Sequence, residues 1–361
     1  MSYKLAFLNQ PSSAQVVYIY RYRLTYTLSM KVALFSTKSY DREFFDHCNT
    51  SGNIQLTYFE APLNIDTVNL TKGFQAICVF VNDKVDNTVI KKLAENGVGL
   101  IALRCAGFNN IDLVAAKENN ITVLRVPAYS PEAIAEHAVA LILTLNRKTH
   151  KAYNRIRENN YSLEKLIGFN LAGKTIGVIG TGRTGAAFCK IMLGFGCTVI
   201  ANDIIESTDL ISMGVVYTPF KELLQAADII SLHCPLTPET KHLVNKNAFS
   251  KMKRGVMLIN TSRGAVMDTQ EAIRALKNGS LGYLGMDVYE QEENLFFKDL
   301  SESIIQDDVI ARLMSFPNVL ITAHQGFFTK EAVEEIVTTT LKNITDFEKG
   351  IQSTNEVKTT S

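Results

Sequence analysis

Three ionisable residues in the C-terminal half of the sequence have side chains suited to carbonyl chemistry. Each lies shortly after an apolar run typical of a β-strand: Arg263, Glu292 and His324. A guanidinium group binds a carboxylate through two parallel hydrogen bonds. A histidine can give a proton to a carbonyl oxygen near neutral pH, and a carboxylate beside it orients the imidazole and stabilises its charged form. Together they predict a site that binds a carboxylate and reduces a neighbouring carbonyl group.

Two of these residues have a simpler interpretation when taken singly. Arg263 would also suit the solvated end of a strand, and Glu292, close to Glu290 and Glu293, would suit an exposed acidic run. The three candidates converge only if their strands belong to one parallel sheet, because ligands of such sheets bind beyond the carboxyl ends of the strands.

The other histidines are weaker catalytic candidates. His137 lies in an apolar helical stretch, which favours a packed core position over a catalytic role. His233 ends a strand-like run, where it would line a ligand cleft. Three histidines in polar surroundings are expected at the surface: His47, His150 and His242. No two histidines have the spacing of metal ligands on one element, so we expect no metal site.

A glycine motif follows the strand-like run at 176–179 and opens a helical stretch. Its first glycine permits a tight turn, its second lets a pyrophosphate approach the backbone, and its third lets the helix lie close to the strand. The helix N-terminus then offers unpaired N–H groups to phosphates. The candidate cofactor contacts in this motif are Gly180, Gly182, Arg183, Thr184 and Gly185.

The next strand ends at Asp203, 23 residues after Gly180 (203 − 180). An acid at that position accepts hydrogen bonds from the adenosine ribose and repels a 2′-phosphate. No Lys or Arg lies between Asp203 and Lys221 to bind such a phosphate. The pattern therefore favours NAD over NADP as the cofactor, and the alternative is a strand–turn–helix unit that binds no nucleotide.

Short apolar runs alternate with helical patterns from Met30 onward, which predicts an α/β fold of two doubly wound parallel-sheet domains. The first series of strands is expected at 31–36, 54–59, 76–81, 99–104 and 121–126, with helices at 89–96 and 112–118. The second series is expected at 175–179, 198–202, 229–233, 256–260, 282–288 and 319–323. We expect a cleft between the two domains.

The longest helices suggest how the domains connect. Ser130 and Pro131 form a good helix start, and this helix is expected to run past Arg155 and to bridge the domains. The last helix, from Thr329 to about Lys349, has no later strand in the second series, so we expect it to pack on the first domain. The predicted limits are 30–129 with 327–361 for a flavodoxin-like substrate domain and 130–326 for a Rossmann NAD domain. Residues 1–29 are interpreted as an extension of unknown role, with a targeting or structural role as the alternatives.

The composition is that of a globular protein and excludes several function classes. Of the 361 residues, 46% are apolar and 20% are charged, and the formal net charge is +1. Such a balance gives no overall field that favours nucleic acid or an anionic membrane. The six cysteines form no CxxC pair, which favours reduced thiols in a cytoplasmic protein. No apolar run approaches the roughly 18 residues that a membrane helix needs.

The chain from Met30 to about Gly350 resembles the D-isomer-specific 2-hydroxyacid dehydrogenase family, and within it the fermentative D-lactate dehydrogenases. The motifs that carry the resemblance are GVIGTGRTG, SLHCPLTPET, MLINTSRGAVMDT, GMDVYEQEENLFF and VLITAHQGFFT. The stretch from Phe296 to Phe316 resembles the insertion typical of the lactate enzymes.

The resemblance implies roles for individual residues. It assigns carboxylate binding to Arg263, proton transfer to His324 and support of His324 to Glu292. The implied substrate contacts are the loop Cys105-Ala106-Gly107, through its backbone, and the side chains of Tyr129 and Phe327. Further implied cofactor contacts are His233, Cys234, Pro235, Thr261 and Asp287, of which Asp287 would meet the nicotinamide amide.

The function that the resemblance implies is the reduction of pyruvate to D-lactate by NADH. One alternative is a reductase of bulkier 2-oxo acids such as phenylpyruvate or 2-oxoisocaproate, although Tyr129 and Phe327 would crowd a large side chain. Another is a non-catalytic NAD-sensing corepressor, which the complete Arg263, Glu292 and His324 set disfavours. The expected partners are a small-molecule substrate and further copies of the chain in a homodimer or homotetramer.

Overall fold

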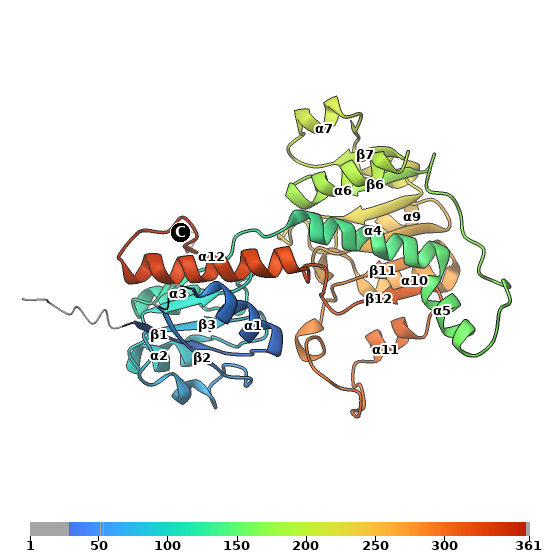
Figure 1. The fold of residues 1–361 in the computed structure, drawn as a ribbon. Helices are drawn as coiled ribbons and strands as arrows, with labels where there is room; N and C mark the ends of the chain where they lie inside the picture. Colours follow the sequence, from blue (N-terminus) through green and yellow to red (C-terminus); the bar gives the residue numbers. More distant parts are fainter. Residues whose placement is uncertain (1–28, 51, 53, 359–361) are drawn as a thin grey trace, which may run out of the picture.

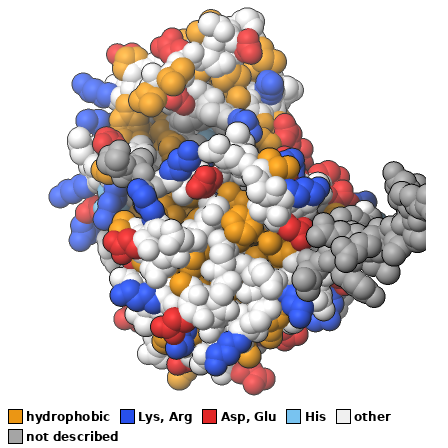
Figure 2. Space-filling view, turned by 90° about the vertical axis from the view of Figure 1, so that its left-hand side faces the viewer, with side chains coloured by type: hydrophobic (Ala, Val, Ile, Leu, Met, Phe, Trp, Pro, Cys, Tyr) orange, Lys and Arg blue, Asp and Glu red, His pale blue; other side chains and the backbone are white. Residues whose placement is uncertain are grey.

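The computed structural model describes residues 29–50, 52 and 54–358, and they form two lobes built on two parallel sheets (Figure 1). The predicted extension, residues 1–29, lies outside the described residues except for its last position. On the face shown in Figure 2, side chains of both signs are interspersed, so that face carries no broad region of a single charge. No helix in the described ranges has the length and apolarity needed to cross a membrane.

The smaller lobe holds a five-stranded sheet with the strand order β2-β1-β3-β4-β5. Its strands are β1 (Met30–Leu34), β2 (Ile54–Tyr58), β3 (Ala76–Val79), β4 (Leu100–Leu103) and β5 (Thr122–Leu124). One face is covered by α2 (Asn87–Glu95) and α3 (Leu113–Glu118), and the other by α1 (Ser39–Cys48) and α12 (Lys330–Glu348). The prediction that the last helix packs on the first sheet is therefore confirmed.

The larger lobe holds a seven-stranded sheet with the order β12-β11-β10-β9-β6-β7-β8. Its strands are β6 (Thr175–Ile179), β7 (Thr198–Asn202), β8 (Val216–Tyr217), β9 (Ile229–Leu232), β10 (Val256–Asn260), β11 (Leu281–Met286) and β12 (Val319–Ile321). The strand order reverses between β6 and β9, which pair directly. Ligands of doubly wound sheets bind at such a reversal, so the fold places a ligand crevice at the carboxyl ends of these two strands.

Helices cover both faces of the larger sheet and bury its apolar side chains. One face packs against α4 (Pro131–Arg147) and α6 (Arg183–Gly194). The other packs against α8 (Phe220–Ala226), α9 (Lys246–Lys251), α10 (Thr269–Asn278) and α11 (Asp308–Met314). The remaining elements are η1 (Val68–Thr71), α5 (Thr149–Arg157), α7 (Thr208–Ser212), η2 (Gly264–Val266) and η3 (Glu292–Asn294). The expected fold class, two doubly wound α/β domains, is thus confirmed.

The helix that begins after Ser130 does not run unbroken past Arg155, as the sequence had suggested. It ends at Arg147, and Lys148 takes a left-handed conformation, with φ of 51°, before α5 begins. A residue with a left-handed φ cannot continue a right-handed α-helix. Just before this break, the Asn146 amide pairs with both backbone groups of Phe169, at 2.7 and 2.8 Å, so the returning chain contacts the last turn of α4. The two-residue edge strand β8 was also missed.

Candidate active site

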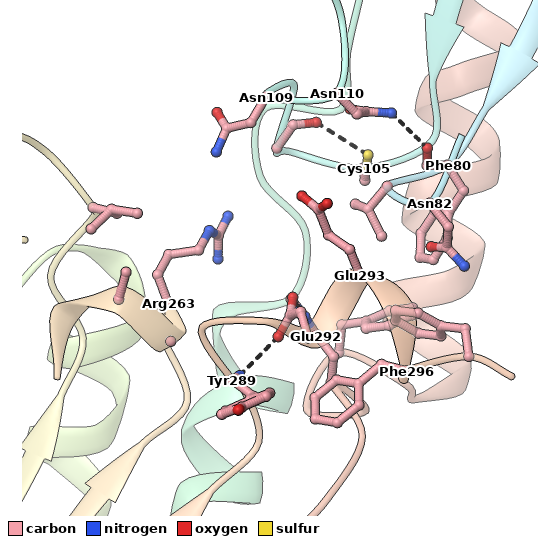
Figure 3. Close-up of a pocket in the computed structure, with 18 of the residues that line it drawn as sticks. Phe80, Asn82, Cys105, Asn109, Asn110, Arg263, Tyr289, Glu292, Glu293 and Phe296 are labelled. Carbon is pink, nitrogen blue, oxygen red and sulfur yellow. Dashed lines mark hydrogen bonds and ion pairs between the residues drawn. The ribbon is translucent and has the colours of Figure 1, made fainter. Parts of the chain in front are cut away.

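One cavity between the lobes brings together the three residues that the sequence singled out, Arg263, Glu292 and His324. Arg263 and Glu292 are labelled in the view of this cavity in Figure 3. All three come from the larger lobe, from segments that follow β10, β11 and β12. The smaller lobe supplies the opposite wall, which includes Phe80 and Gly107. The parallel sheet explains this convergence, since its strands end along one edge.

His324 is held in a fixed orientation by two contacts. It has a φ of 52°, and its backbone N–H donates to the carbonyl of Asp287 at 2.7 Å. The ring atom Nδ1 lies 2.8 Å from Oε1 of Glu292, whose other oxygen accepts a hydrogen bond from the Tyr289 N–H at 2.9 Å. Because the carboxylate requires a proton on Nδ1, Nε2 is the nitrogen that remains for a substrate. Glu292 is therefore a bound partner of the imidazole, not part of an exposed run.

The segment that carries His324 is clamped by the carboxylate of Asp287. Its oxygens accept from the N–H groups of Gln325 (2.9 Å) and Gly326 (2.8 Å) and from the Thr322 hydroxyl (2.5 Å). His137 Nε2 lies 3.3 Å from the same carboxylate. Burial raises the pKa of Asp287, but the hydrogen bonds from His137 and Thr322 outweigh it and leave that pKa below its usual value. Contact of Asp287 with a nicotinamide amide stays a prediction.

Arg263 is positioned by a buried side chain that sequence reasoning missed. Asn260, at the end of β10, donates to the Arg263 carbonyl at 3.0 Å and accepts from both the N–H and the hydroxyl of Ser262. The next residue, Gly264, is essential to this turn, since a Cβ there would lie 2.1 Å from the carbonyl carbon of Tyr289. The turn therefore packs tightly against the segment that leads to Glu292. The side chain of Arg263 lines the cavity.

Aromatic rings form the wall around His324. Tyr129 and Phe327, both expected substrate contacts, lie with ring centroids 5.9 Å apart. The sequence did not identify Phe80 or Phe297, whose centroids lie 5.2 Å apart, although Phe297 falls within the insertion typical of lactate enzymes. Burial raises the pKa of Tyr129 to about 12, so its phenol stays neutral and can act as a donor.

Two glycines of the motif, Gly180 and Gly185, lie where an added Cβ would clash with backbone atoms. Gly180 has a φ of +91°, and a Cβ there would lie 2.5 Å from the backbone nitrogen of Cys234. A Cβ on Gly185 would lie 1.9 Å from the Gly180 carbonyl oxygen. Gly182, by contrast, faces open space, with nothing within 4 Å of its Cβ position. Arg183 and Thr184 form the first turn of α6, which no described side chain caps, so its N–H groups are available for phosphates.

Asp203 accepts three hydrogen bonds within its own lobe. One oxygen accepts from the N–H and the hydroxyl of Thr181, at 2.5 and 3.1 Å, and the other accepts from the N–H of Ile205 at 3.2 Å. Burial raises the pKa of Asp203, yet these hydrogen bonds leave it below its usual value. The residue is therefore an anion at neutral pH and retains accepting capacity for a ribose hydroxyl.

Two buried polar atoms at the carboxyl edge of the larger sheet, at or next to the strand reversal, lack partners within the described part of the chain. They are Nδ1 of His233, after β9, and Oγ1 of Thr261, after β10. Burial lowers the pKa of His233 to about 3, so the imidazole is neutral. Unpaired polar groups in such a position suit a polar ligand, because an unsatisfied buried atom is costly. Cys234 and the exposed Pro235 follow directly, and the arrangement fits a dinucleotide cofactor.

Two histidines expected at the surface are only partly exposed. His242 places Nε2 2.6 Å from Oε1 of Glu290, so the carboxylate pulls the side chain against the protein. His150 has a buried Nδ1 without a partner in the described ranges. His47 is exposed, as expected. The position of His242 could not be read from its polar neighbours alone, since its partner Glu290 comes from a distant segment.

Comparison with known proteins shows which family the chain resembles. The family model for "D-isomer specific 2-hydroxyacid dehydrogenase, NAD binding domain" matches residues 139–326. The D-lactate dehydrogenase of Escherichia coli K12 is 51% identical over 328 residues, which span 91% of this chain and 100% of that protein.

Two solved structures show the same fold over nearly the whole described chain. The structure of the pyruvate reductase of Chlamydomonas reinhardtii superposes with a TM-score of 0.88 at 44% identity, over 91% of this chain and 98% of that one. The D-lactate dehydrogenase of Aquifex aeolicus, complexed with NAD and lactic acid, gives a TM-score of 0.80 at 37% identity, over 91% and 100%. The chain belongs to the D-isomer-specific 2-hydroxyacid dehydrogenase family and is an NAD-dependent oxidoreductase of that family.

Proposed function

We propose that the chain reduces pyruvate to D-lactate, with His324 as the proton donor. The observation that carries this proposal is the pairing of His324 Nδ1 with Glu292 at 2.8 Å, in a cavity that also holds the guanidinium of Arg263. This arrangement leaves Nε2 to face a bound carbonyl oxygen. Two similar proteins, the E. coli D-lactate dehydrogenase and the C. reinhardtii pyruvate reductase, support the choice of substrate.

The residues divide the work of the reaction. Arg263 binds the substrate carboxylate through its forked donors, together with backbone N–H groups of the loop at 105–107. His324 gives its Nε2 proton to the carbonyl oxygen, while Glu292 stabilises the imidazolium before the transfer. Gly182, Asp203, His233 and Thr261 would hold NADH, which would supply the hydride for C2 of the substrate. Exclusion of water between the lobes strengthens each of these electrostatic contacts.

The aromatic wall supports a small substrate. Phe80, Phe297 and Phe327 surround the cavity beside His324, with Phe297 and His324 ring centroids 6.0 Å apart. Each methylene added to the substrate must fit against these rings, and moving packed aromatic side chains to make room for it costs free energy. The bulkier 2-oxo acids therefore remain the alternative substrates against which pyruvate is compared.

The test is a panel of 2-oxo acids assayed with NADH: pyruvate, 2-oxoisocaproate and phenylpyruvate, with chiral analysis of the product. We expect the highest kcat/KM for pyruvate and a D-product, with His324→Ala losing several orders of magnitude. A preference for phenylpyruvate would replace the proposed substrate. Failure to oxidise NADH with any 2-oxo acid, despite NADH binding, would favour the NAD-sensing corepressor.

We also propose the wider setting of the enzyme. The domain limits stay at 30–129 with 327–361 and at 130–326, and the chain is expected to act in the cytoplasm as a homodimer or homotetramer. Sedimentation equilibrium of the purified chain tests the assembly, and a monomer at micromolar concentration would contradict it.

A further inference from the structure

The loop at 105–107 has all three of its carbonyl groups bound to protein. The Cys105 carbonyl accepts from the N–H of Val126 at 3.2 Å. The Ala106 carbonyl accepts from Nη1 of Arg125 at 2.9 Å. The Gly107 carbonyl accepts from Sγ of Cys105 at 3.3 Å, a contact visible in Figure 3. The loop is therefore fixed by its carbonyl oxygens.

The N–H groups of the same loop are free. Among the described residues, neither the Ala106 N–H nor the Gly107 N–H donates a hydrogen bond. A peptide unit is planar, and in its trans form the C=O and the following N–H point in opposite directions. The bond from Arg125 to the Ala106 carbonyl thus sets the direction of the Gly107 N–H. Gly107 itself lines the cavity, and its Cβ position lies 3.8 Å from Nη2 of Arg263.

Arg125 is itself held in place from three sides. Its carbonyl accepts from the Asn343 amide of α12 at 2.9 Å, and its N–H donates to the carbonyl of Asn355 at 3.1 Å. The amide of Asn355 closes this network by donating to Asn343 at 2.9 Å. The guanidinium also lies over the ring of Phe108, 5.1 Å from its centroid. Its backbone and its charged end are both fixed before any substrate arrives.

We propose that Arg125 is a positioning residue that aims the Gly107 N–H at the substrate carboxylate. This inference rests on the proposed function, because it assumes that Arg263 and the loop share one carboxylate. Arg125 does not touch the substrate in this account. It holds one peptide plane, so that a neutral donor and the Arg263 guanidinium meet the two oxygens of the same anion. A correctly aimed N–H raises affinity for a carboxylate without any change in the nucleotide site.

The test replaces Arg125 with Met, which keeps a long apolar stem and removes the donors. We expect the KM for pyruvate to rise at least tenfold, with a smaller change in kcat and an unchanged Kd for NADH measured by fluorescence. The matched control is Arg254→Met, which removes another arginine-to-carbonyl bond, to Asn278 at 3.0 Å, far from the cavity. Arg254→Met should leave the KM for pyruvate and the Kd for NADH unchanged.

A pyruvate KM within twofold of wild type in folded Arg125→Met would overturn the inference. Equal losses of pyruvate and NADH affinity in the folded variant would also overturn it, because they would show that Arg125 supports the protein as a whole and not the carboxylate site. If Arg125→Met does not fold, Arg125→Lys is measured instead. It keeps the charge but has a single nitrogen, so the KM should rise at least threefold, and an unchanged KM would overturn the inference. A wild-type chain that reduces no 2-oxo acid would instead defeat the proposed function.

Discussion

The imidazole of His137 and the carboxylate of Asp287 lie 3.3 Å apart, between α4 and the end of β11, and this pair anchors the segment that carries His324. The side chain of Asp287 is 3% exposed and also accepts from Gln325 and Gly326. The position of His324, the proposed proton donor, thus depends on the carboxylate of Asp287, although the two side chains do not contact each other.

Asp287→Asn should reduce kcat/KM for pyruvate by at least about tenfold. Hydrogen bonds to a charged group contribute about 1.5–3 kcal/mol each. The Asn amide has one accepting oxygen and one donating NH2 group, so it cannot accept from all the donors that now bond to the two carboxylate oxygens. Steady-state kinetics with pyruvate and NADH measure the effect. The control is Asp228→Asn, a carboxylate bonded to Lys253 and Thr175 away from the cavity, which should keep its activity.

The same carboxylate should make stability depend on pH. The pKa of Asp287 is below its usual value in the folded chain, so its ionised form stabilises the fold above about pH 3.9, the usual value for an unfolded Asp. That stabilisation is lost as the pH falls through the lower folded value. The difference in Tm between wild type and Asp287→Asn should therefore shrink below pH 4. A constant difference from pH 7 to pH 3 would show that the charge of Asp287 does not stabilise the fold.

Asp203 should set the preference between the two nicotinamide cofactors. We expect NADH to be preferred over NADPH by at least about tenfold in kcat/KM, because the carboxylate would lie near a 2′-phosphate at short range. Asp203→Ala should narrow that gap, whereas Asp209→Ala, an exposed acid on α7, should not. Equal use of both cofactors by the wild type would refute this role.

Arg263→Lys keeps the positive charge and loses the forked pair of donors. We expect a higher KM for pyruvate and a lower kcat, with a combined loss of about 2–5 kcal/mol in kcat/KM, as for buried charged pairs that lose one partner. NADH binding should be little changed. Arg274→Lys on the exposed side of α10 is the matched control. Wild-type affinity for pyruvate in Arg263→Lys would remove Arg263 from carboxylate binding.

A chain that starts at Met30 should fold and keep full activity. The first strand begins at Met30, and the N–H of this residue donates to the Glu348 carboxylate at 3.2 Å. The new amino group would keep that contact. Thermal unfolding and kcat/KM of the shortened chain measure the outcome, and a loss of solubility or activity would give residues 1–29 a structural role.

Much of the fold followed from local patterns, whereas the supports of the site did not. The strands that precede Arg263 and His324 were visible because apolar periodicity reports burial along one segment. The break at Lys148 was not visible, because neither its left-handed backbone nor the contact of Asn146 with a loop more than twenty residues later leaves a local pattern. Arg125 was missed for the same reason, since its partners lie on distant segments.

The loss of Glu292 tests the central claim, that this carboxylate orients His324 so that Nε2 gives the proton to the substrate. The carboxylate lies 2.8 Å from Nδ1 of His324 and leaves Nε2 to face a bound carbonyl oxygen. The measurement is kcat/KM for pyruvate and the Kd for NADH in wild type and Glu292→Ala, with Glu293→Ala as a control for a nearby carboxylate that Figure 3 shows beside the same cavity. We predict that Glu292→Ala lowers kcat/KM at least about tenfold, because a well-placed general acid contributes about 10²–10⁴-fold, while NADH binding is unchanged and Glu293→Ala has a smaller effect. Wild-type kcat/KM in Glu292→Ala would contradict the account.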